Sequence, residues 1–157
     1  MGFWSGRLLE GTKNKCIDYY LSEVPDRYRA AIRSGFPSQP QTIVNIHIEM
    51  APRFFNELEI FLRIKGNYSS TEIDNHFLDA EAKALATVCK KIGLEYEQAE
   101  DCLSDKAYDL ADSQFNKNLT PIENFKKISG GRELSGKSVL FRHWVFKAFE
   151  FIHAQDD

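Results

Sequence analysis

The sequence predicts an all-α fold: a single compact helical domain over residues 1–157, with about six to eight helices. Apolar residues recur every three or four positions through most of the chain, which is the spacing of one buried helix face. Capping residues stand at the starts of several of these stripes, and glycines stand at their ends. With 43% hydrophobic and 27% charged residues, the 157-residue chain has the composition and length of a domain that buries a core.

The N-terminal part is predicted to form two helices. Apolar residues follow helical spacing over residues 12–24. Pro25 then stands where a new helix can begin, because proline is favoured in a first turn. The second helix is expected to end at Gly35, since glycine commonly terminates helices.

Residues 42–50 permit two interpretations. Ile46, Ile48 and Met50 alternate as in a β-strand, whereas the other apolar residues of the segment suit one helical face. Helix is the favoured interpretation, and a short strand here would make the fold α+β. A strong apolar stripe over residues 52–66 then predicts a further helix that ends at a glycine.

The middle of the chain carries the clearest helix signals. Ser69 and Glu72 have the spacing of a capping box, in which each residue binds the backbone of the other. The apolar stripe that follows runs to Gly93, so one long helix is expected between them. Residues 94–113 carry a further stripe and are predicted to form the next helix.

Two more helices are expected towards the C-terminus. Thr120 and Glu123 repeat the capping-box spacing with a proline between them, which predicts a short helix ending at Ile128. Residues 138–154 are apolar on nearly all sides. A helix of that kind belongs inside a core, so we predict that it is the central helix.

One segment matches a phosphate-binding motif. Residues Gly131–Ser138 fit the pattern G-x-x-x-x-G-K-[ST], in which a strand delivers a glycine-rich loop to a phosphate. Here a helix cap precedes the segment and only 19 residues follow it, so no parallel sheet can surround it. We predict a turn between two helices, with phosphate binding by Lys137 and Ser138 as the alternative.

Two groups of residues have the spacing of metal ligands. They are Glu72, His76 and Asp79 on one helical face, and Glu150 with His153 in a Glu-x-x-His pair. A di-iron helical bundle needs such a pair twice, and the sequence holds it once. His47 and Glu49 complete a site only if the fold brings them close. The favoured interpretation therefore contains no metal and no other cofactor.

The charges are unevenly distributed along the chain. The net charge is only −3, yet residues 71–112 hold eleven acidic against four basic residues. Residues 117–147 hold seven basic against two acidic residues. This separation of acidic and basic residues along the chain therefore indicates function more clearly than any motif does.

Five acidic residues fall on one side of the helix predicted over residues 94–113, opposite its apolar stripe. They are Glu97, Asp101, Asp105, Asp109 and Asp112, and we call them the acidic face. Three successive pairs at four-residue spacing repel one another, each at a cost of about 0.2–0.5 kcal/mol. Lys106 is the only basic residue of this helix within reach of them. Since the acidic face does not stabilise its own helix, we predict that it binds a basic partner.

The favoured function is therefore that of a non-enzymatic protein-binding protein. An inhibitor of the immunity or antitoxin type, which blocks a basic protein such as a nuclease toxin, fits the size, the charge and the lack of catalytic motifs. The alternative is an enzyme that binds a metal through Glu72, His76 and Asp79, or a phosphate through the Gly131–Ser138 loop. The overall acidic charge argues against direct nucleic-acid binding.

The same sequence argues for a cytoplasmic protein. Three cysteines are an odd number without metal-ligand spacing, which suits a reducing compartment. No secretory signal and no run of 18 apolar residues is present, so we expect no membrane partner.

Overall fold

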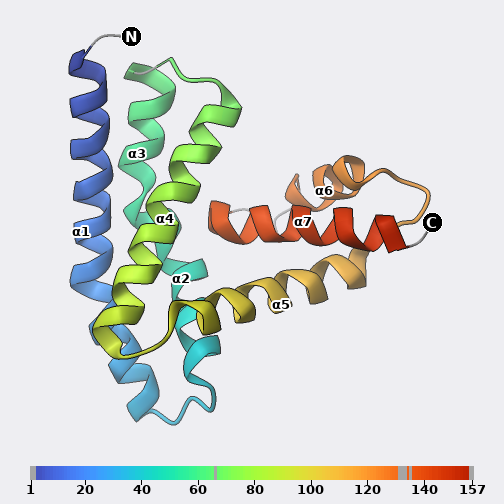
Figure 1. The fold of residues 1–157 in the computed structure, drawn as a ribbon, viewed down its shortest axis with the longest axis horizontal. Coiled ribbons are helices and arrows are strands. Elements are labelled where there is room, and N and C mark those ends of the chain that lie inside the picture. The colour runs from blue at the N-terminus through green and yellow to red at the C-terminus, as the bar shows by residue number, and fades with distance from the viewer. Residues whose placement is uncertain (1–2, 66, 131–133, 135, 156–157) are drawn as a thin grey trace.

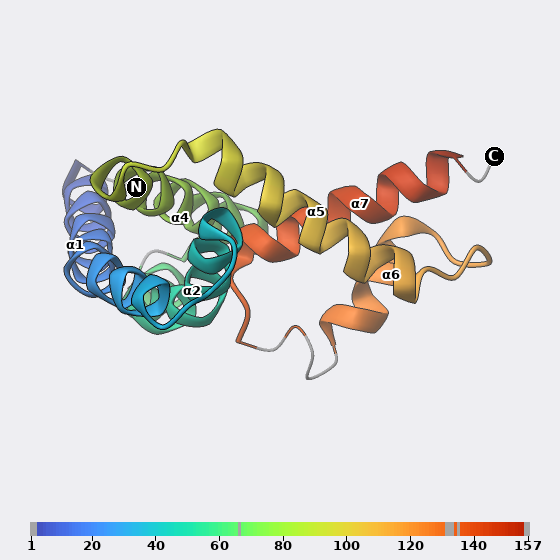
Figure 2. The same ribbon diagram turned by 90° about the horizontal axis from the view of Figure 1, so that it is seen from below.

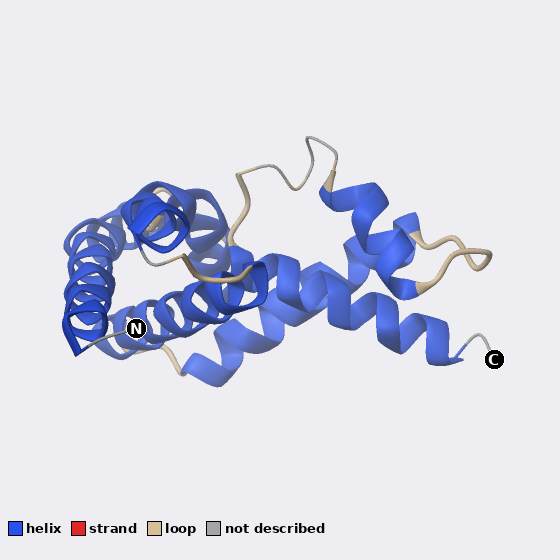
Figure 3. Cartoon of the chain, turned by 90° about the horizontal axis from the view of Figure 1, so that it is seen from above, coloured by secondary structure: helices blue, strands red, loops and turns tan. Residues whose placement is uncertain are grey.

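The computed structural model describes residues 3–65, 67–130, 134 and 136–155, and these residues form seven α-helices and no strand (Figure 3). The predicted all-α fold with six to eight helices is confirmed. The elements in chain order are α1 (Phe3–Arg33), α2 (Gln39–Phe54), α3 (Asn56–Ile60), the π-helical turn η1 (Phe61–Lys65), α4 (Ser70–Ile92), α5 (Tyr96–Gln114), α6 (Pro121–Ser129) and α7 (Val139–Gln155).

The helices are arranged in a bundle and an arm (Figures 1 and 2). The bundle contains α1 to α4, in which α1 packs against both α2 and α4. The arm contains α5, α6 and α7, and it extends away from the bundle on one side. The base of the arm is fixed because α5 contacts α2 and α4 while α7 contacts α4.

The prediction of two separate N-terminal helices is wrong. One helix, α1, runs through Pro25 without a break. Proline removes one backbone N–H, and a helix tolerates this by bending where neighbouring elements hold both halves. Figure 1 shows α1 changing direction in its C-terminal part, where it continues along α2.

The two interpretations of residues 42–50 are resolved in favour of helix. All of these residues lie in α2, and most of its apolar side chains are buried. The strand alternative is wrong because the segment packs between α1 and α5, and offers apolar groups to more than one side. Helix α2 continues through Pro52, and the helical path resumes as α3 and η1. The glycine expected to end this stretch, Gly66, lies outside the described residues.

Both predicted capping boxes are present. The Ser69 hydroxyl accepts a hydrogen bond from the Glu72 N–H, and the Glu72 carboxylate accepts one from the Ser69 N–H. Thr120 and Glu123 form the same reciprocal pair at the start of α6. Gly93 ends α4 with a φ of 76°, in the left-handed region that glycine adopts without strain.

The last helix, α7, lies between α5 and α6 in the arm, and its N-terminal end reaches α4. It buries Leu140, Phe141, Val145 and Phe149. The sequence predicted a helix surrounded on all sides, but Phe151 is 53% exposed. The difference arises because the arm projects from the bundle, so that one side of α7 faces solvent.

None of the helices within the described ranges combines the length and the hydropathy that crossing a lipid bilayer requires.

Candidate functional site

The acidic face occupies the outer side of α5. All five of its carboxylate-bearing residues are exposed to solvent. The opposite side of α5 buries Ala99, Leu103, Ala107 and Ala111, mainly against α7. The small alanine side chains let the two helices approach closely, and this close packing fixes which side of α5 faces outward.

Among the residues that the structure describes, no basic side chain neutralises the acidic face. Within the described part of the chain, none of its five carboxylates takes part in an ion pair. Lys106, the one basic residue on α5, turns towards α2 and donates a hydrogen bond to the Asn45 carboxamide oxygen. Burial and the neighbouring Lys137 lower the pKa of Lys106. Lys106 is therefore directed away from the acidic face.

The negative field acts on a nearby thiol. Cys102 lies half-buried on α5, and its pKa is raised, first by burial and then by the charges of Asp105 and Asp101. Only the smaller part of this shift comes from the acidic face, because a thiolate is disfavoured beside carboxylates.

A groove of about 350 Å³ lies between α5 and α7, on the flank of the acidic face. Tyr108 of α5 and Trp144 and Phe151 of α7 contribute aromatic walls. The rings of Tyr108 and Phe151 meet edge to face, with their centroids 6.0 Å apart. Asp105 of the acidic face also lines this groove, so the apolar and the acidic surfaces are continuous.

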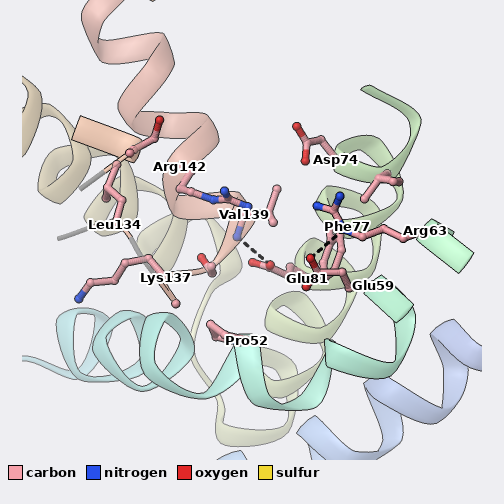
Figure 4. A pocket seen from close by; sticks show the side chains of 15 residues that line it. Pro52, Glu59, Arg63, Asp74, Phe77, Glu81, Leu134, Lys137, Val139 and Arg142 are labelled. Carbon is pink, nitrogen blue, oxygen red and sulfur yellow. Dashed lines mark hydrogen bonds and ion pairs between the residues drawn. The ribbon is translucent and has the colours of Figure 1, made fainter. Parts of the chain in front are cut away.

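A second, more polar pocket of about 430 Å³ lies where the arm joins the bundle (Figure 4). Asp74 projects from α4 and Arg142 from α7, on opposite sides of this pocket. Arg63 also lines it and is paired with Glu59 at 2.9 Å. The Nε atom of Arg142 is buried and has no hydrogen-bond partner among the described residues.

The carboxylate of Glu81 lies at the inner end of this pocket and is almost completely buried. One of its oxygens accepts a hydrogen bond from the Val139 N–H at 2.9 Å. The other accepts from the Leu140 N–H at 3.2 Å and contacts Nε2 of His47 at 3.2 Å. Glu81 of α4 therefore caps the N-terminus of α7, where free N–H groups and the helix dipole favour a negative charge.

A buried chain of hydrogen bonds continues from Glu81 into the bundle. The Tyr20 hydroxyl lies 3.0 Å from Nδ1 of His47. Burial raises the pKa of Tyr20 well above its usual range, so the hydroxyl keeps its proton in its hydrogen bond with Nδ1. The other ring nitrogen of His47, Nε2, forms a hydrogen bond with the Glu81 carboxylate. Each of these groups has a partner, and together they connect α1, α2, α4 and α7.

The hydrogen bonds of Glu81 are relevant to the alternative prediction that the Gly131–Ser138 loop binds phosphate. Residues 131–133 and 135 of the Gly131–Ser138 motif lie outside the described residues. Ser138 is buried and accepts a hydrogen bond from the Phe141 N–H at 3.0 Å, as a helix-capping residue does. Glu81 already occupies the Val139 and Leu140 N–H groups, which are the donors that a phosphate at this helix end would use.

The residues considered as metal ligands each have another role. The Glu72 carboxylate belongs to the capping box, and the His76 ring packs edge to face on Tyr68. Asp79 pairs with Lys13 and Lys83, both at 3.3 Å. Over the residues that the structure describes, no three His, Cys, Asp or Glu side chains are close enough together to hold a metal ion.

The other two proposed ligand pairs are likewise not assembled into a site. Glu150 pairs with Lys147 at 3.5 Å, and Nδ1 of His153 is buried without a partner. Glu49 pairs with Arg27 at 2.6 Å on the surface, whereas His47 turns inward to Glu81.

The buried role of Glu81 was not predicted from the sequence, although its position in an apolar stripe was a signal for it. In the apolar stripe of α4, Glu81 stands four residues after Phe77 and four before Leu85, where a buried residue is expected. A charged residue at such a position is buried only with partners that compensate it. Those partners lie 34 and 58 residues away, too far for any local pattern to identify them.

Comparisons with known proteins place the chain in no family, because no family model, no curated protein and no solved structure matches it. The function is therefore argued from the surfaces and pockets of this chain alone.

Proposed function

We propose that this protein is a non-enzymatic protein-binding protein, and that its acidic face on α5 binds and blocks a basic partner. More specifically, we propose an inhibitor of the immunity or antitoxin type that acts on a basic protein such as a nuclease toxin. The observation that carries the proposal is a row of five exposed carboxylates that no basic side chain of the described residues neutralises.

The energetics of α5 support a role outside its own fold. Three like-charge pairs at four-residue spacing cost about 1 kcal/mol together, and a single lysine among them would remove most of this cost. A dense field of one sign accelerates association with an oppositely charged protein and disfavours wrong partners. A row of carboxylates also presents the kind of charge that a nuclease meets in the phosphates of its substrate.

The setting proposed for this interaction is the cytoplasm. Cys16, Cys89 and Cys102 are all free thiols. Burial raises the pKa of Cys16, and it raises the pKa of Cys89 to about 11, so both thiols resist oxidation in the folded protein. Three free cysteines are typical of a reducing compartment.

The test compares two double variants that change the charge equally. Asp101→Lys with Asp105→Lys alters the acidic face, and Asp18→Lys with Glu23→Lys alters exposed acids of α1. Each purified protein is immobilised and exposed to a lysate of the source organism at low and at high salt, and the retained proteins are identified by mass spectrometry. We expect one basic protein at stoichiometric level, which salt releases and which only the first variant fails to retain. Equal retention by both variants would contradict the proposal.

A second candidate function is the binding of a small ligand in the pocket between α4 and α7, as in the enzymatic alternative. The specific observation is the buried Nε of Arg142, which lies opposite Asp74 and has no hydrogen-bond partner in the described part of the chain. A ligand that binds only the folded state raises the melting temperature, and the rise grows with the logarithm of the ligand concentration above Kd. Inorganic phosphate and ATP, each tested against wild type and Arg142→Gln, would show whether this pocket is occupied.

A further inference from the structure

The groove between α5 and α7 is lined by three aromatic residues, Tyr108, Trp144 and Phe151. Trp144, Lys147, Ala148 and Phe151 follow one another at helical spacing along the same side of α7. Ala148 is small and leaves a depression between the larger side chains. Tyr108 of α5 closes the opposite wall.

One of the three aromatic side chains is not held by the packing of the arm. Trp144 and Tyr108 are partly buried against the core, whereas Phe151 leaves 53% of its surface in solvent. Aromatic groups that border a depression are typical of protein interfaces, where Trp and Tyr supply much of the binding free energy.

We propose that this groove receives an apolar side chain from a basic segment of the partner protein. The proposal rests on the proposed function, and it identifies the part of the interface that gives affinity beyond electrostatic attraction. Asp105 belongs to both surfaces, so an apolar anchor in the groove places the residues flanking it against the carboxylates of α5. The occupant is therefore an aliphatic or aromatic residue flanked by Lys or Arg.

The charges around the groove argue against a second copy of this chain as the occupant. In a two-fold symmetric dimer the same surface meets itself. Asp105 and the rest of the acidic face would then lie against their own copies, and like charges across an interface are strongly unfavourable. Lys147 does not offset this repulsion, because it is paired with Glu150 of its own helix.

The experiment uses the full chain and two matched exposed phenylalanines. Phe151→Ala removes one wall of the groove, and Phe36→Ala removes a phenylalanine of similar exposure, 55%, at the turn between α1 and α2. Both residues are exposed, so both variants are expected to fold, which far-UV circular dichroism checks. The dissociation constant is measured for the basic protein retained from the lysate, after its purification.

A second measurement identifies what occupies the groove. Phe151 is replaced by p-benzoylphenylalanine, the complex is irradiated, and the cross-linked peptide is sequenced by mass spectrometry. We expect a partner peptide with an apolar residue flanked by basic residues. We also expect Phe151→Ala to weaken binding about tenfold or more, as at an interface hot spot, while Phe36→Ala leaves binding unchanged.

The possible failures are distinguishable. Wild-type affinity of Phe151→Ala, together with loss of binding in Asp101→Lys with Asp105→Lys, would overturn the groove and leave the proposed function standing. A cross-link to a second copy of this chain, or to a segment without basic residues, would also overturn the inference. If wild type retains no protein from the lysate, both the inference and the proposed function fail.

Discussion

At the scale of single residues, the most consequential position is Glu81. A carboxylate in the core is tolerated only because its oxygens accept from two backbone N–H groups and from His47. The Tyr20 hydroxyl in turn forms a hydrogen bond with His47, so the polar groups of this buried network are satisfied. An apolar residue in place of Glu81 would leave the start of α7 without an acceptor.

Replacing Glu81 with alanine is expected to destabilise the protein strongly. The buried donors on Leu140 and His47 and the part-buried N–H of Val139 lose their acceptor. Each buried unsatisfied group costs about 1–3 kcal/mol, so the free energy of unfolding should fall by about 2 kcal/mol or more. Urea denaturation followed by circular dichroism measures the change. Asp18→Ala, at an exposed site on α1, serves as the control and should stay within about 0.5 kcal/mol of wild type. A loss below about 1 kcal/mol for Glu81→Ala would contradict the role given to this network.

The sequence revealed local interactions and missed distant ones. Ser69 and Thr120 were assigned to their capping boxes because both partners lie three residues apart. Glu81 could not be assigned, since its partners come from α2 and α7. His47 was considered as a possible metal ligand, but its partner in the structure is Glu81. In the sequence, Glu81 was counted only as one of the eleven acidic residues of the segment 71–112.

At the scale of elements, α5 combines two unlike surfaces. Its inner side is a stripe of alanine and leucine that packs on α7, and its outer side is the acidic face. The amphipathic pattern predicted this division correctly, because a helix wheel depends only on spacing. The direction of Lys106 was not predictable, because the Asn45 oxygen that it binds lies 61 residues away on α2.

Asp101→Lys is expected to stabilise the folded protein. The substitution changes two repulsive pairs, with Glu97 and with Asp105, into attractive ones, which should raise the free energy of unfolding by up to about 1 kcal/mol at low salt. The gain should shrink at high salt, because screening weakens interactions between exposed charges. Urea denaturation at two salt concentrations tests this, with Asp18→Lys on α1 as a control of equal charge change. A destabilised Asp101→Lys variant would show that the repulsion is compensated in the folded protein.

The boundaries of elements were less predictable than their existence. Pro25 indicated a helix boundary, but α1 continues through it because both halves pack against other helices. The secondary structure of residues 42–50 was ambiguous in the sequence. A helix that is buried on several sides has apolar residues at positions that also fit the alternation of a strand.

At the scale of the whole molecule, the bundle and the arm meet through α2, α4, α5 and α7. The contact is anchored by Glu81, which joins the interior of the bundle to the first turn of α7. An interface of this kind couples the two parts, so that neither retains its packing when the other unfolds.

The bundle and the arm are therefore expected to unfold in one transition. Trp144 lies on α7 and reports on the arm, and Trp4→Phe makes it the only tryptophan of the chain. Fluorescence of this variant and far-UV circular dichroism, which reports on all helices, should give the same urea midpoint and slope. An earlier midpoint by fluorescence would mean that the arm unfolds on its own.

The position of Glu81 in the chain also sets an order of assembly during synthesis. Val139, which donates to Glu81, follows it by 58 residues, so at about 5–20 residues per second a ribosome delivers the start of α7 about 3–12 s after α4. Tyr20, His47 and Glu81 exist together well before that time. In a nascent chain the carboxylate of Glu81 is still hydrated, and arrival of α7 exchanges that water for two backbone donors. Synthesis of α7 is thus coupled to closure of the core at the junction between bundle and arm.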